Sequence, residues 1–277
     1  MDAMGLAQVC QIDPIVADIL LQRGITTVQQ AQNFLFGKQM IYHDPMTMQD
    51  MPRAVARIWQ AIKRQENILI VGDSDADGIT ATAVLLMYLR SVGAKVTYYI
   101  PTSEEIMSFW QGKKRDVIEG ISLILTVDTG ISSSLENTAF AGIDVIITDH
   151  HECKRRLPMV YAVIDPKRRD DAYPFAQLSG AGVALKLICA LAAQSGNPQD
   201  EFLRYCDLVA IGTVADAMPL HDENRCIVKQ GLARIQKRQR VGLDMLLKSA
   251  AYNFHRPITA SSAGFVIAPR LNAAGRI

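Results

Sequence analysis

Cysteine is scarce in this sequence and is not arranged for a disulfide framework or a structural zinc site. The five cysteines are an odd number, they are scattered along the chain, and none stands in a Cys-x-x-Cys pair. Disulfide-dense proteins belong to oxidising compartments, so this pattern favours a reducing one.

Long apolar runs are also missing. No run approaches the ~20 residues that a membrane-spanning helix needs. The first four residues, Met-Asp-Ala-Met, do not form a basic segment leading into an apolar stretch, which is the mark of a signal peptide. We therefore expect a cytoplasmic protein with no membrane partner.

A strong net charge is absent as well. The formal net charge is +1, which gives no global signature of a nucleic-acid-binding protein and leaves only local patches for that role. Basic clusters do occur, and for each of them alone a solvated surface is the simpler interpretation. They lie at residues 113–115, 155–156, 167–169 and 237–240.

What the chain does contain is typical of a globular protein. It has 277 residues, of which 49% are hydrophobic and 21% are charged, enough for one large domain or two small ones. Apolar positions with helical spacing predict an N-terminal helical segment over residues 1–50, followed by a helix over 51–64.

A β-α alternation follows this helix. Short apolar runs predict strands, and the stretches between them predict helices at 80–92, 104–119 and 132–140. Such a pattern indicates a parallel sheet covered on both faces. The predicted strands are 68–71, 95–100, 123–127, 145–148 and 161–164.

The fold class predicted is therefore α/β, a parallel β-sheet flanked by helices with a following helical portion. We expect the division to be an N-terminal helical segment over 1–50, a parallel α/β core over 51–166, and a helical part over 167–277 that completes the same domain. Helices are predicted in this last part at about 180–194, 199–214, 225–237 and 243–251.

Acidic residues gather where the predicted strands end. Asp73, Asp75 and Asp77 occupy alternate positions directly after the first strand. Alternate residues of an extended segment point the same way, so we expect Asp75 and Asp77 to reach one small volume. Crowded carboxylates repel one another, and a divalent cation between them relieves that repulsion.

Two further strand ends carry the same chemistry. Asp128 follows the predicted strand 123–127, and Asp149, His150 and His151 follow 145–148. Ligands of parallel sheets bind at the carboxyl ends of the strands. Imidazole shifts the favoured metal from calcium toward manganese, magnesium or zinc. The pattern therefore indicates a metal-dependent hydrolase acting on phosphate.

The sequence allows two roles for each of several residues near these clusters. Asp73 is either an acid that orients a ligand or a turn residue, whereas Asp149 is expected to position the histidines by hydrogen bonds rather than to bind metal. Gly180 opens a helix that either holds a phosphate or is merely structural. Phe109 and Trp110 lie beside a basic cluster, where packing is a simpler role than base stacking.

Five motifs in order along the chain resemble the DHH phosphoesterase superfamily and, within it, the RecJ family. The first and third motifs are those of the superfamily, and the last two point to the RecJ family. The motifs are Asp73-Ser-Asp-Ala-Asp-Gly-Ile-Thr80, Val127-Asp-Thr-Gly130, Thr148-Asp-His-His-Glu152, Gly212-Thr-Val-Ala-Asp216 and Pro269-Arg-Leu-Asn-Ala-Ala-Gly-Arg276.

The resemblance implies a set of site residues. His151 would contact the scissile phosphate as a catalytic residue, and Asp128 would bridge two divalent cations, Mn²⁺ or Mg²⁺. The implied metal ligands are Asp75, Asp77, Asp128, His150 and Asp216. The implied contacts to the phosphates of a nucleic acid are Arg270, Asn272 and, with less support, Arg276.

The function implied is that of a metal-dependent 5′-to-3′ exonuclease, which hydrolyses single-stranded DNA to mononucleotides in DNA repair and recombination. Its partner would be single-stranded DNA. Two alternatives stay open: a phosphodiesterase for short oligonucleotides or cyclic dinucleotides, and a catalytically impaired module that only binds.

Two departures from the family pattern matter. Residues 102–111 replace a loop that in the family usually begins with a basic residue and is rich in glycine and tyrosine. The family also continues past the position of Arg276 into a second catalytic-side domain and an OB-fold domain, which this sequence does not include. The expectation is a metal-bearing core.

Overall fold

The computed structural model describes residues 2–37, 42–102, 104–133, 140–194 and 196–274. The chain divides into two compact units, residues 1–42 and residues 43–277, and each unit is described by itself. The boundary lies eight residues before the one expected from the sequence, at 50. The further division at residue 166 stays a prediction.

The first unit is a small helical bundle. It contains α1 (Ala3–Cys10), α2 (Pro14–Gln22) and α3 (Val28–Phe36). Side-chain caps define the helix starts, and Thr27 forms a capping box with Gln30 at α3. Among the described residues no single helix is long and apolar enough to cross a membrane, although α1 and α2, bent by 118°, pass that test as a pair by length and composition.

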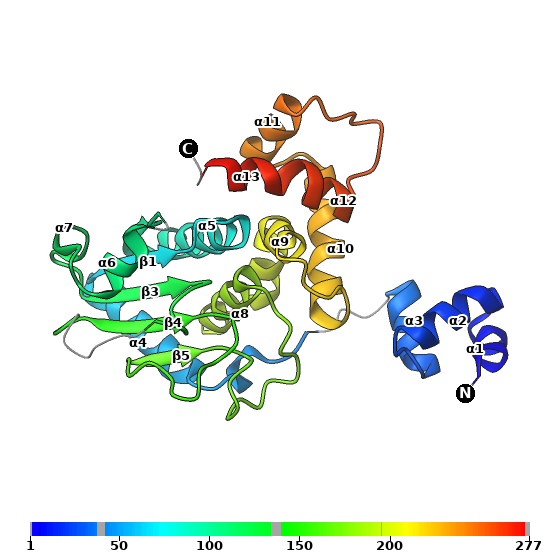
Figure 1. Cartoon of the computed structure of the whole chain (residues 1–277), viewed down its shortest axis with the longest axis horizontal. Helices are drawn as coiled ribbons and strands as arrows, with labels where there is room; N and C mark the ends of the chain where they lie inside the picture. Colours follow the sequence, from blue (N-terminus) through cyan, green and yellow to red (C-terminus); the bar gives the residue numbers. More distant parts are fainter. Residues whose placement is uncertain (1, 38–41, 103, 134–139, 195, 275–277) are drawn as a thin grey trace. The chain divides into compact units, whose positions relative to one another are not determined.

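The second unit is built on a five-stranded parallel sheet (Figure 1). The prediction of a parallel α/β fold is confirmed. The strand order is β2-β1-β3-β4-β5, so the chain leaves β1 toward one side and then returns to its other side. The strands are β1 (Asn67–Gly72), β2 (Lys95–Tyr99), β3 (Leu123–Val127), β4 (Asp144–Thr148) and β5 (Ala162–Ile164).

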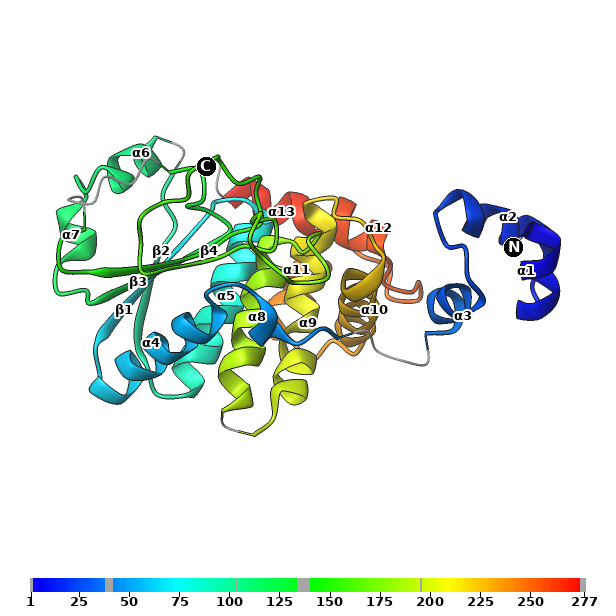
Figure 2. The same ribbon diagram turned by 90° about the horizontal axis from the view of Figure 1, so that it is seen from below.

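Helices cover both faces of this sheet, as Figure 2 shows. On one face lie α4 (Met51–Arg64), α5 (Ala76–Ser91) and α8 (Gly180–Ala193), with α9 (Pro198–Ala215) packed against α5 and α8. On the other lie α6 (Glu105–Trp110) and α7 (Arg115–Ile118). Because both faces are covered, every residue of β3 is buried, which explains why Thr126 is its only polar residue.

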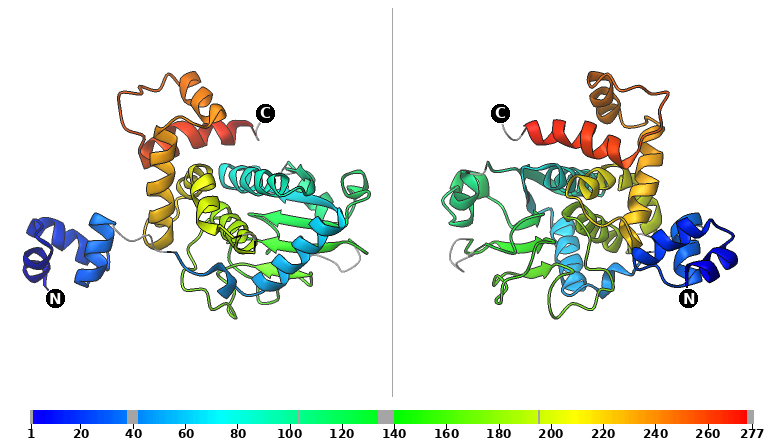
Figure 3. Two further views of the ribbon diagram at one scale, coloured as in Figure 1. Left: turned by 180° about the vertical axis from the view of Figure 1, so that it is seen from behind. Right: turned by 45° about the vertical axis from the view of Figure 1, so that its right-hand side comes forward.

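The remaining elements follow α9. They are α10 (Asp222–Gln236), α11 (Val241–Ser249), α12 (Ala260–Ser262), a π-helical turn η2 (Ala263–Ile267) and α13 (Ala268–Ala274), while a short 3-10 turn η1 (Pro45–Thr47) precedes α4. In Figure 3, α13 lies across α5 and α9, with which it is in contact. The helical run over 260–274 was not predicted from the sequence.

The expected extended segment at residues 73–77 is wrong. Helix α5 begins at Ala76 instead of near residue 80, because the carboxylate of Asp75 caps it by accepting the backbone N–H of Gly78 at 2.9 Å. Asp75 and Asp77 are therefore the N-cap and the second residue of a helix, and not neighbours on one side of a strand.

The predicted helix over 104–119 is also wrong in detail. It is two short helices, α6 and α7, separated by Gly112, whose φ of +67° ends the first. Phe109 and Trp110 are buried, with ring centroids 5.2 Å apart, so both belong to the core. Most of the helix predicted at 132–140 lies outside the described residues.

A buried ion pair ties the helices of this unit together. Nζ of Lys186 on α8 donates to Oε1 of Glu223 on α10 at 2.7 Å and to the backbone oxygen of His43 at 2.6 Å. The hydroxyl of Tyr173 donates to the other oxygen of Glu223. Removing one partner of a buried pair leaves a charge out of water, so this pair couples α8, α10 and the first residue of the unit.

Candidate metal centre

A row of aspartates lies along the carboxyl edge of the sheet. In the register of the strands, Gly72 is paired with Val127, Val127 with Thr148, and Thr148 with Ile164. The residue after each of these four is an aspartate, and the backbone ladder continues through the N–H groups of Asp128 and Asp149, each 3.0 Å from its acceptor. The row consists of Asp73, Asp128, Asp149 and Asp165.

The row crosses the point where the strand order reverses. The sheet runs outward from β1 to β2 on one side and to β3 on the other. Such a reversal opens a crevice between the loops of the two strands, which is where parallel α/β sheets bind ligands. Asp73 to Asp77 follow β1 and Asp128 follows β3, so the predicted ligands stand on both sides of this crevice.

Asp77 enters the site from the first turn of α5. Its side chain is 1% exposed. Oδ2 accepts the backbone N–H of Gly180 at 2.6 Å, and Oδ1 accepts that of Ala181 at 3.1 Å. Both donors belong to the N-terminus of α8, where the helix dipole favours a negative charge. The backbone N–H of Gly180, for which the sequence left open a phosphate or a structural role, therefore donates to the carboxylate of Asp77.

His150 is the centre of the acidic cluster. Its Nε2 lies 3.1 Å from Oδ1 of Asp128, 3.6 Å from Oδ2 of Asp216 and 3.9 Å from Oδ2 of Asp77. Asp216 is the C-cap of α9. The four side chains thus come from four separate segments of the chain, as expected from the sequence.

His151 and its neighbours form a second group. Ligand-type atoms of Asp128, His150 and His151 lie within 4.8 Å of one another, as do those of Asp77, His150 and Asp216. The side chain of His151 is 52% exposed, in contrast to the buried His150. One histidine therefore faces the acids, and the other reaches the solvent.

Asp149 positions both histidines. Its Oδ1 accepts hydrogen bonds from Nδ1 of His151 and from the backbone N–H of His150, both at 2.7 Å. Its Oδ2 accepts a hydrogen bond from the backbone N–H of Ile131 at 2.9 Å. Because Nδ1 of His151 is bonded to Asp149, Nε2 is the ring nitrogen of His151 that remains for another partner. This agrees with the expectation that Asp149 orients the histidines instead of binding metal.

The backbone at Asp128 has a rare conformation. Its φ is 60°, in the left-handed region that aspartate tolerates better than most residues but that still costs energy. Such outliers persist where the surroundings fix them, and they cluster at functional sites. The turn after β3 is therefore held in a shape that carries the carboxylate of Asp128 into the crevice.

Two glycines permit the close approach of helices to these acids. A Cβ at Gly180 would lie 2.4 Å from Oδ1 of Asp128, and a Cβ at Gly212 would lie 2.3 Å from Oδ1 of Asp77. Neither contact is possible for a real side chain. In the sequence Gly212 is only one residue of a motif, and its steric role follows from the packing of α9 against α5.

Burial and repulsion perturb the acids of the cluster. Burial raises the pKa of Asp77 to about 7, and the charges of Asp216 and Asp75 add to this effect. Burial and the charge of Asp77 likewise raise the pKa of Asp128 well above its usual range. These are the electrostatics of carboxylates crowded out of water, which a cation relieves.

The two histidines shift in opposite directions. Burial lowers the pKa of His150 to about 4, which favours the neutral form that binds metals. The hydrogen bond to Asp149 raises the pKa of His151 to about 9. The adjacent histidines are therefore chemically different: the buried one is suited to be a ligand, and the exposed one is suited to donate a hydrogen bond.

The residues fit a divalent cation. Oδ1 of Asp128 is buried and accepts no hydrogen bond from the described part of the chain. A buried acceptor of this kind requires a partner. Carboxylate oxygens, here with one imidazole, are donors that suit manganese or magnesium. Thiolate-rich donor sets select other metals. The donor set is thus one that Mn²⁺ or Mg²⁺ would accept.

Of the five predicted ligands, the structure brings four together: Asp77, Asp128, His150 and Asp216. Asp75 lies near enough for its charge to act on Asp77 and Asp216, but its Oδ1 caps α5. The role of each residue as a metal ligand stays a prediction.

The predicted phosphate contacts lie on α13. Oδ1 of Asn272 accepts the backbone N–H of Ala76 at 2.6 Å, which attaches α13 to the start of α5. Arg270 is exposed and donates to the backbone oxygen of Val266 at 2.7 Å. Arg276 lies outside the described residues. The substrate-binding roles of these residues remain predictions.

Sequence reasoning missed Asp165. This residue follows β5 and is 0% exposed; its Oδ1 accepts the N–H of Lys167 at 2.8 Å, and its Oδ2 lies 3.6 Å from Sγ of Cys153. Burial raises its pKa to about 7. The strand-end rule that places Asp128 and Asp149 also applies to Asp165, which stands one residue before the boundary predicted at 166.

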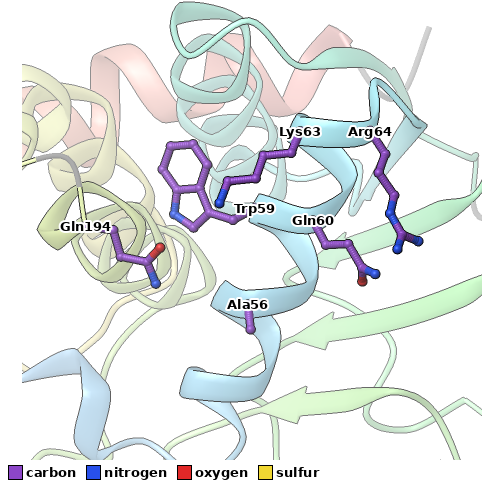
Figure 4. Close-up of a pocket in the computed structure, with 6 residues that line it drawn as sticks. All are labelled: Ala56, Trp59, Gln60, Lys63, Arg64 and Gln194. Atoms are coloured by element: carbon purple, nitrogen blue, oxygen red, sulfur yellow. The ribbon is translucent and has the colours of Figure 1, made fainter.

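A hollow of about 430 Å³ lies elsewhere, between α4 and the residues after α8 (Figure 4). The end of α4 leads into the start of β1, so this hollow belongs to the opposite edge of the sheet. It is lined by Ala56, Trp59, Gln60, Lys63, Arg64 and Gln194. No carboxylate or imidazole lines it, and it is therefore separate from the acidic centre.

The fold and the acidic edge define a class of protein. The family model described as the DHH family, N-terminal domain, matches residues 67–213. This is more than half of the chain, and it includes the strand ends and the start of α9. The chain belongs to the DHH family, as the motifs indicated.

Within this family the chain is similar to RecJ proteins. It is 44% identical over 281 residues to the single-stranded-DNA-specific exonuclease RecJ of Bacillus subtilis, an alignment that covers 99% of this chain and 34% of that protein. The chain thus spans about a third of the length of this relative.

Two solved structures of RecJ from Thermus thermophilus are similar as well. The one in complex with Mn²⁺ has a TM-score of 0.82 and 32% identity, and the match covers 99% of this chain and 39% of the other. The one in complex with Mg²⁺ has a TM-score of 0.70 and 30% identity, with coverages of 99% and 36%. The resemblance to RecJ predicted from the motifs is confirmed.

We predict that Gly212→Ala weakens metal binding by at least tenfold. The added methyl group would displace the carboxylate of Asp77, and disturbing the support of a ligand typically costs about 10–100-fold in metal affinity. Calorimetric titration with Mn²⁺ measures this effect. Gly242→Ala is the matched control because nothing lies within 4 Å of a Cβ there. Equal affinities in the two variants would contradict the prediction.

We also predict a pH-dependent effect of Asp165→Asn on stability. Burial raises the pKa of Asp165 to about 7 from 3.8, so the folded chain binds more protons at this site than the unfolded chain between these pH values. The free energy of unfolding of the natural chain should therefore fall, relative to that of the variant, by roughly 4 kcal/mol at most as the pH rises from 4 to 7.

Urea denaturation at a series of pH values, without added metal, measures this difference. The asparagine keeps the oxygen that accepts the N–H of Lys167, so the turn is preserved. Asp116→Asn, at an exposed position, is the control and should show no such trend. A stability difference that stays flat or grows in the natural chain's favour over this range would refute the assignment.

Proposed function

We propose that this chain is the metal-bearing core of a 5′-to-3′ exonuclease that hydrolyses single-stranded DNA to mononucleotides, in DNA repair and recombination. Its membership of the DHH family and its similarity to RecJ proteins support this proposal. The observation that carries it is the position of Nε2 of His150, which faces carboxylates from three other segments at 3.1–3.9 Å.

Two divalent cations, Mn²⁺ or Mg²⁺, complete the proposed site. Asp77, Asp128, His150 and Asp216 would hold them together with Asp75, and Asp128 would bridge the two. When bound, such ions supply an activated water and neutralise charge on the phosphoryl oxygens. The backbone N–H groups of α8 hold Asp77 in place, so that its carboxylate need not reorganise when an ion arrives.

His151 is the proposed contact to the scissile phosphate. Asp149 accepts a hydrogen bond from Nδ1 of His151, which fixes the plane of the ring. Nε2 is then the nitrogen that can donate a hydrogen bond to a substrate oxygen. The ring is half exposed beside the buried His150, so a phosphate that reaches the acidic edge can meet it. A preorganised donor stabilises the charge that develops on the phosphoryl oxygens.

The substrate side of the site includes α13. The oxygen of Asn272 is occupied by the start of α5, so its amide nitrogen is the end that can donate to a phosphate. Arg270 carries an exposed guanidinium that can make two parallel hydrogen bonds to a phosphate. Arg276 is proposed for the same role on sequence alone.

A phosphodiesterase for short oligonucleotides is the second candidate. The observation that favours it is the segment after β2, which forms α6 and buries Phe109 and Trp110 in the core instead of presenting an open loop. Dependence of the rate on substrate length separates the two candidates. A cytoplasmic location without a membrane partner is part of either proposal.

The proposal predicts Mn²⁺-dependent degradation of single-stranded DNA by the purified chain. Strands labelled at the 5′ or the 3′ end show the direction, a duplex shows strand specificity, and Asp116→Ala is the matched control for Asp128→Ala. We expect labelled mononucleotides from the 5′ end, with no product from Asp128→Ala. Degradation of dinucleotides alone would favour the second candidate, and no hydrolysis by a metal-loaded chain would overturn both.

We predict that His151→Ala lowers kcat by about 10²–10³-fold, the usual loss for one preorganised donor to a developing oxyanion. Mn²⁺ affinity should change less than twofold, because the acids and His150 remain. Single-turnover hydrolysis and Mn²⁺ titration measure the two quantities, with the exposed His255→Ala as the control. A parallel loss of kcat and of metal affinity would instead make His151 a ligand.

A further inference from the structure

Lys167 stands at the same edge of the sheet as the acidic centre. It is the third residue after β5, and the backbone N–H of Asp149 donates to Ile164 at the end of that strand. The N–H of Lys167 donates to Oδ1 of the buried Asp165 at 2.8 Å. This turn fixes the backbone of Lys167 beside the segment that carries the two histidines.

The ammonium group of Lys167 has a weakly held partner. Its Nζ lies 3.4 Å from Oε1 of Glu152, whose side chain is 88% exposed, whereas that of Lys167 is only 18% exposed. Most of the Lys167 side chain is thus covered by protein, while its charged end meets a partner that lies in the solvent. An ion pair with so exposed a partner contributes little to stability, so a stronger anion can replace Glu152.

The charge of Lys167 reaches the metal centre. Burial raises the pKa of Asp216, and the charges of His151 and Lys167 oppose that rise. The ion pair also holds this ammonium group next to Glu152, the residue that directly follows His151. Lys167 is therefore a cation beside the segment that carries the histidines, and it is not one of the proposed ligands.

A polyanion that approaches this edge needs such a cation. The aspartate row and Asp77 make the edge acidic, and metal ions held by these carboxylates would offset that charge for the phosphate that binds them. The next phosphate of a strand meets the rim of the site instead. On the β5 side that rim carries Lys167, while Arg270 on α13 stands by α5 and α9.

We propose that Lys167 is a substrate-contacting residue, whose ammonium exchanges Glu152 for a backbone phosphate of single-stranded DNA on the β5 side of the metal centre. This inference rests on the proposed function, because it names how that site holds its substrate. Asp165 acts as a positioning residue for Lys167 through the turn that it caps.

The test measures binding without hydrolysis. A fluorescent 5′-phosphorylated oligothymidylate is titrated with the chain in Ca²⁺ at several salt concentrations between 50 and 200 mM. Each phosphate contact to a single strand contributes about 0.7 to the slope of log K against log salt. We expect Lys167→Gln to reduce this slope by about 0.7 and to weaken binding about tenfold, and Lys167→Arg to retain the slope.

The controls separate this contact from a general loss of charge or of structure. Lys63→Gln removes the same charge at the opposite edge of the sheet and should leave the slope unchanged (Figure 4). Glu152→Gln should bind DNA at least as tightly as the natural chain, because it frees Lys167. Melting temperatures within about 2 °C show that the variants are folded.

Three results would overturn the inference: an unchanged slope in Lys167→Gln, an equal decrease in Lys63→Gln, or weakened binding in Glu152→Gln, which would make the ion pair structural. A natural chain that does not bind the oligonucleotide would overturn it too. A chain that binds DNA through Lys167 but does not hydrolyse it in Mn²⁺ would contradict the proposed nuclease alone, so the two failures can be told apart.

Discussion

Repulsion among buried carboxylates is the constraint on which the rest of this structure depends. The parallel register places an aspartate after each of four adjacent strands, and α5 and α9 add Asp77 and Asp216 to the same edge. Without compensation, the repulsion between these carboxylates would push the surrounding segments apart. The protein compensates with the backbone dipoles at the start of α8, with the hydrogen bonds of Asp149 to its histidines, and with a site whose donors suit divalent cations.

The same constraint explains features of the backbone around the acids. Helices α8 and α9 must approach the acids closely, and only glycine at 180 and 212 allows it. The left-handed backbone at Asp128 lies between a strand ladder that holds its N–H and the start of α8, which lies against its carboxylate, and such fixed surroundings allow a strained residue to persist. These aspartates are all buried and differ in their partners: Asp149 holds histidines, Asp165 holds a turn, and Asp77 and Asp128 face the centre.

Much of this could be predicted from the sequence, and the limits have physical causes. Strand ends are local signals, so Asp128, Asp149 and His150 were placed at one edge by the parallel pattern alone. Asp77 lies in the acidic cluster, but for a different reason from the one expected, because the cap formed by Asp75 starts α5 earlier than the apolar pattern does. The roles of Gly212 and of Asn272 depend on contacts between distant segments, which no local pattern encodes.

Anomalous diffraction at the manganese edge, from crystals of the chain soaked in Mn²⁺, tests the central claim most directly. The account predicts two peaks in the crevice between β1 and β3, with Asp128 between them and His150 bound through Nε2. Their disappearance in Asp128→Ala crystals would confirm that this carboxylate holds both ions. Strong peaks elsewhere on the chain, with none among Asp77, Asp128, His150 and Asp216, would contradict it.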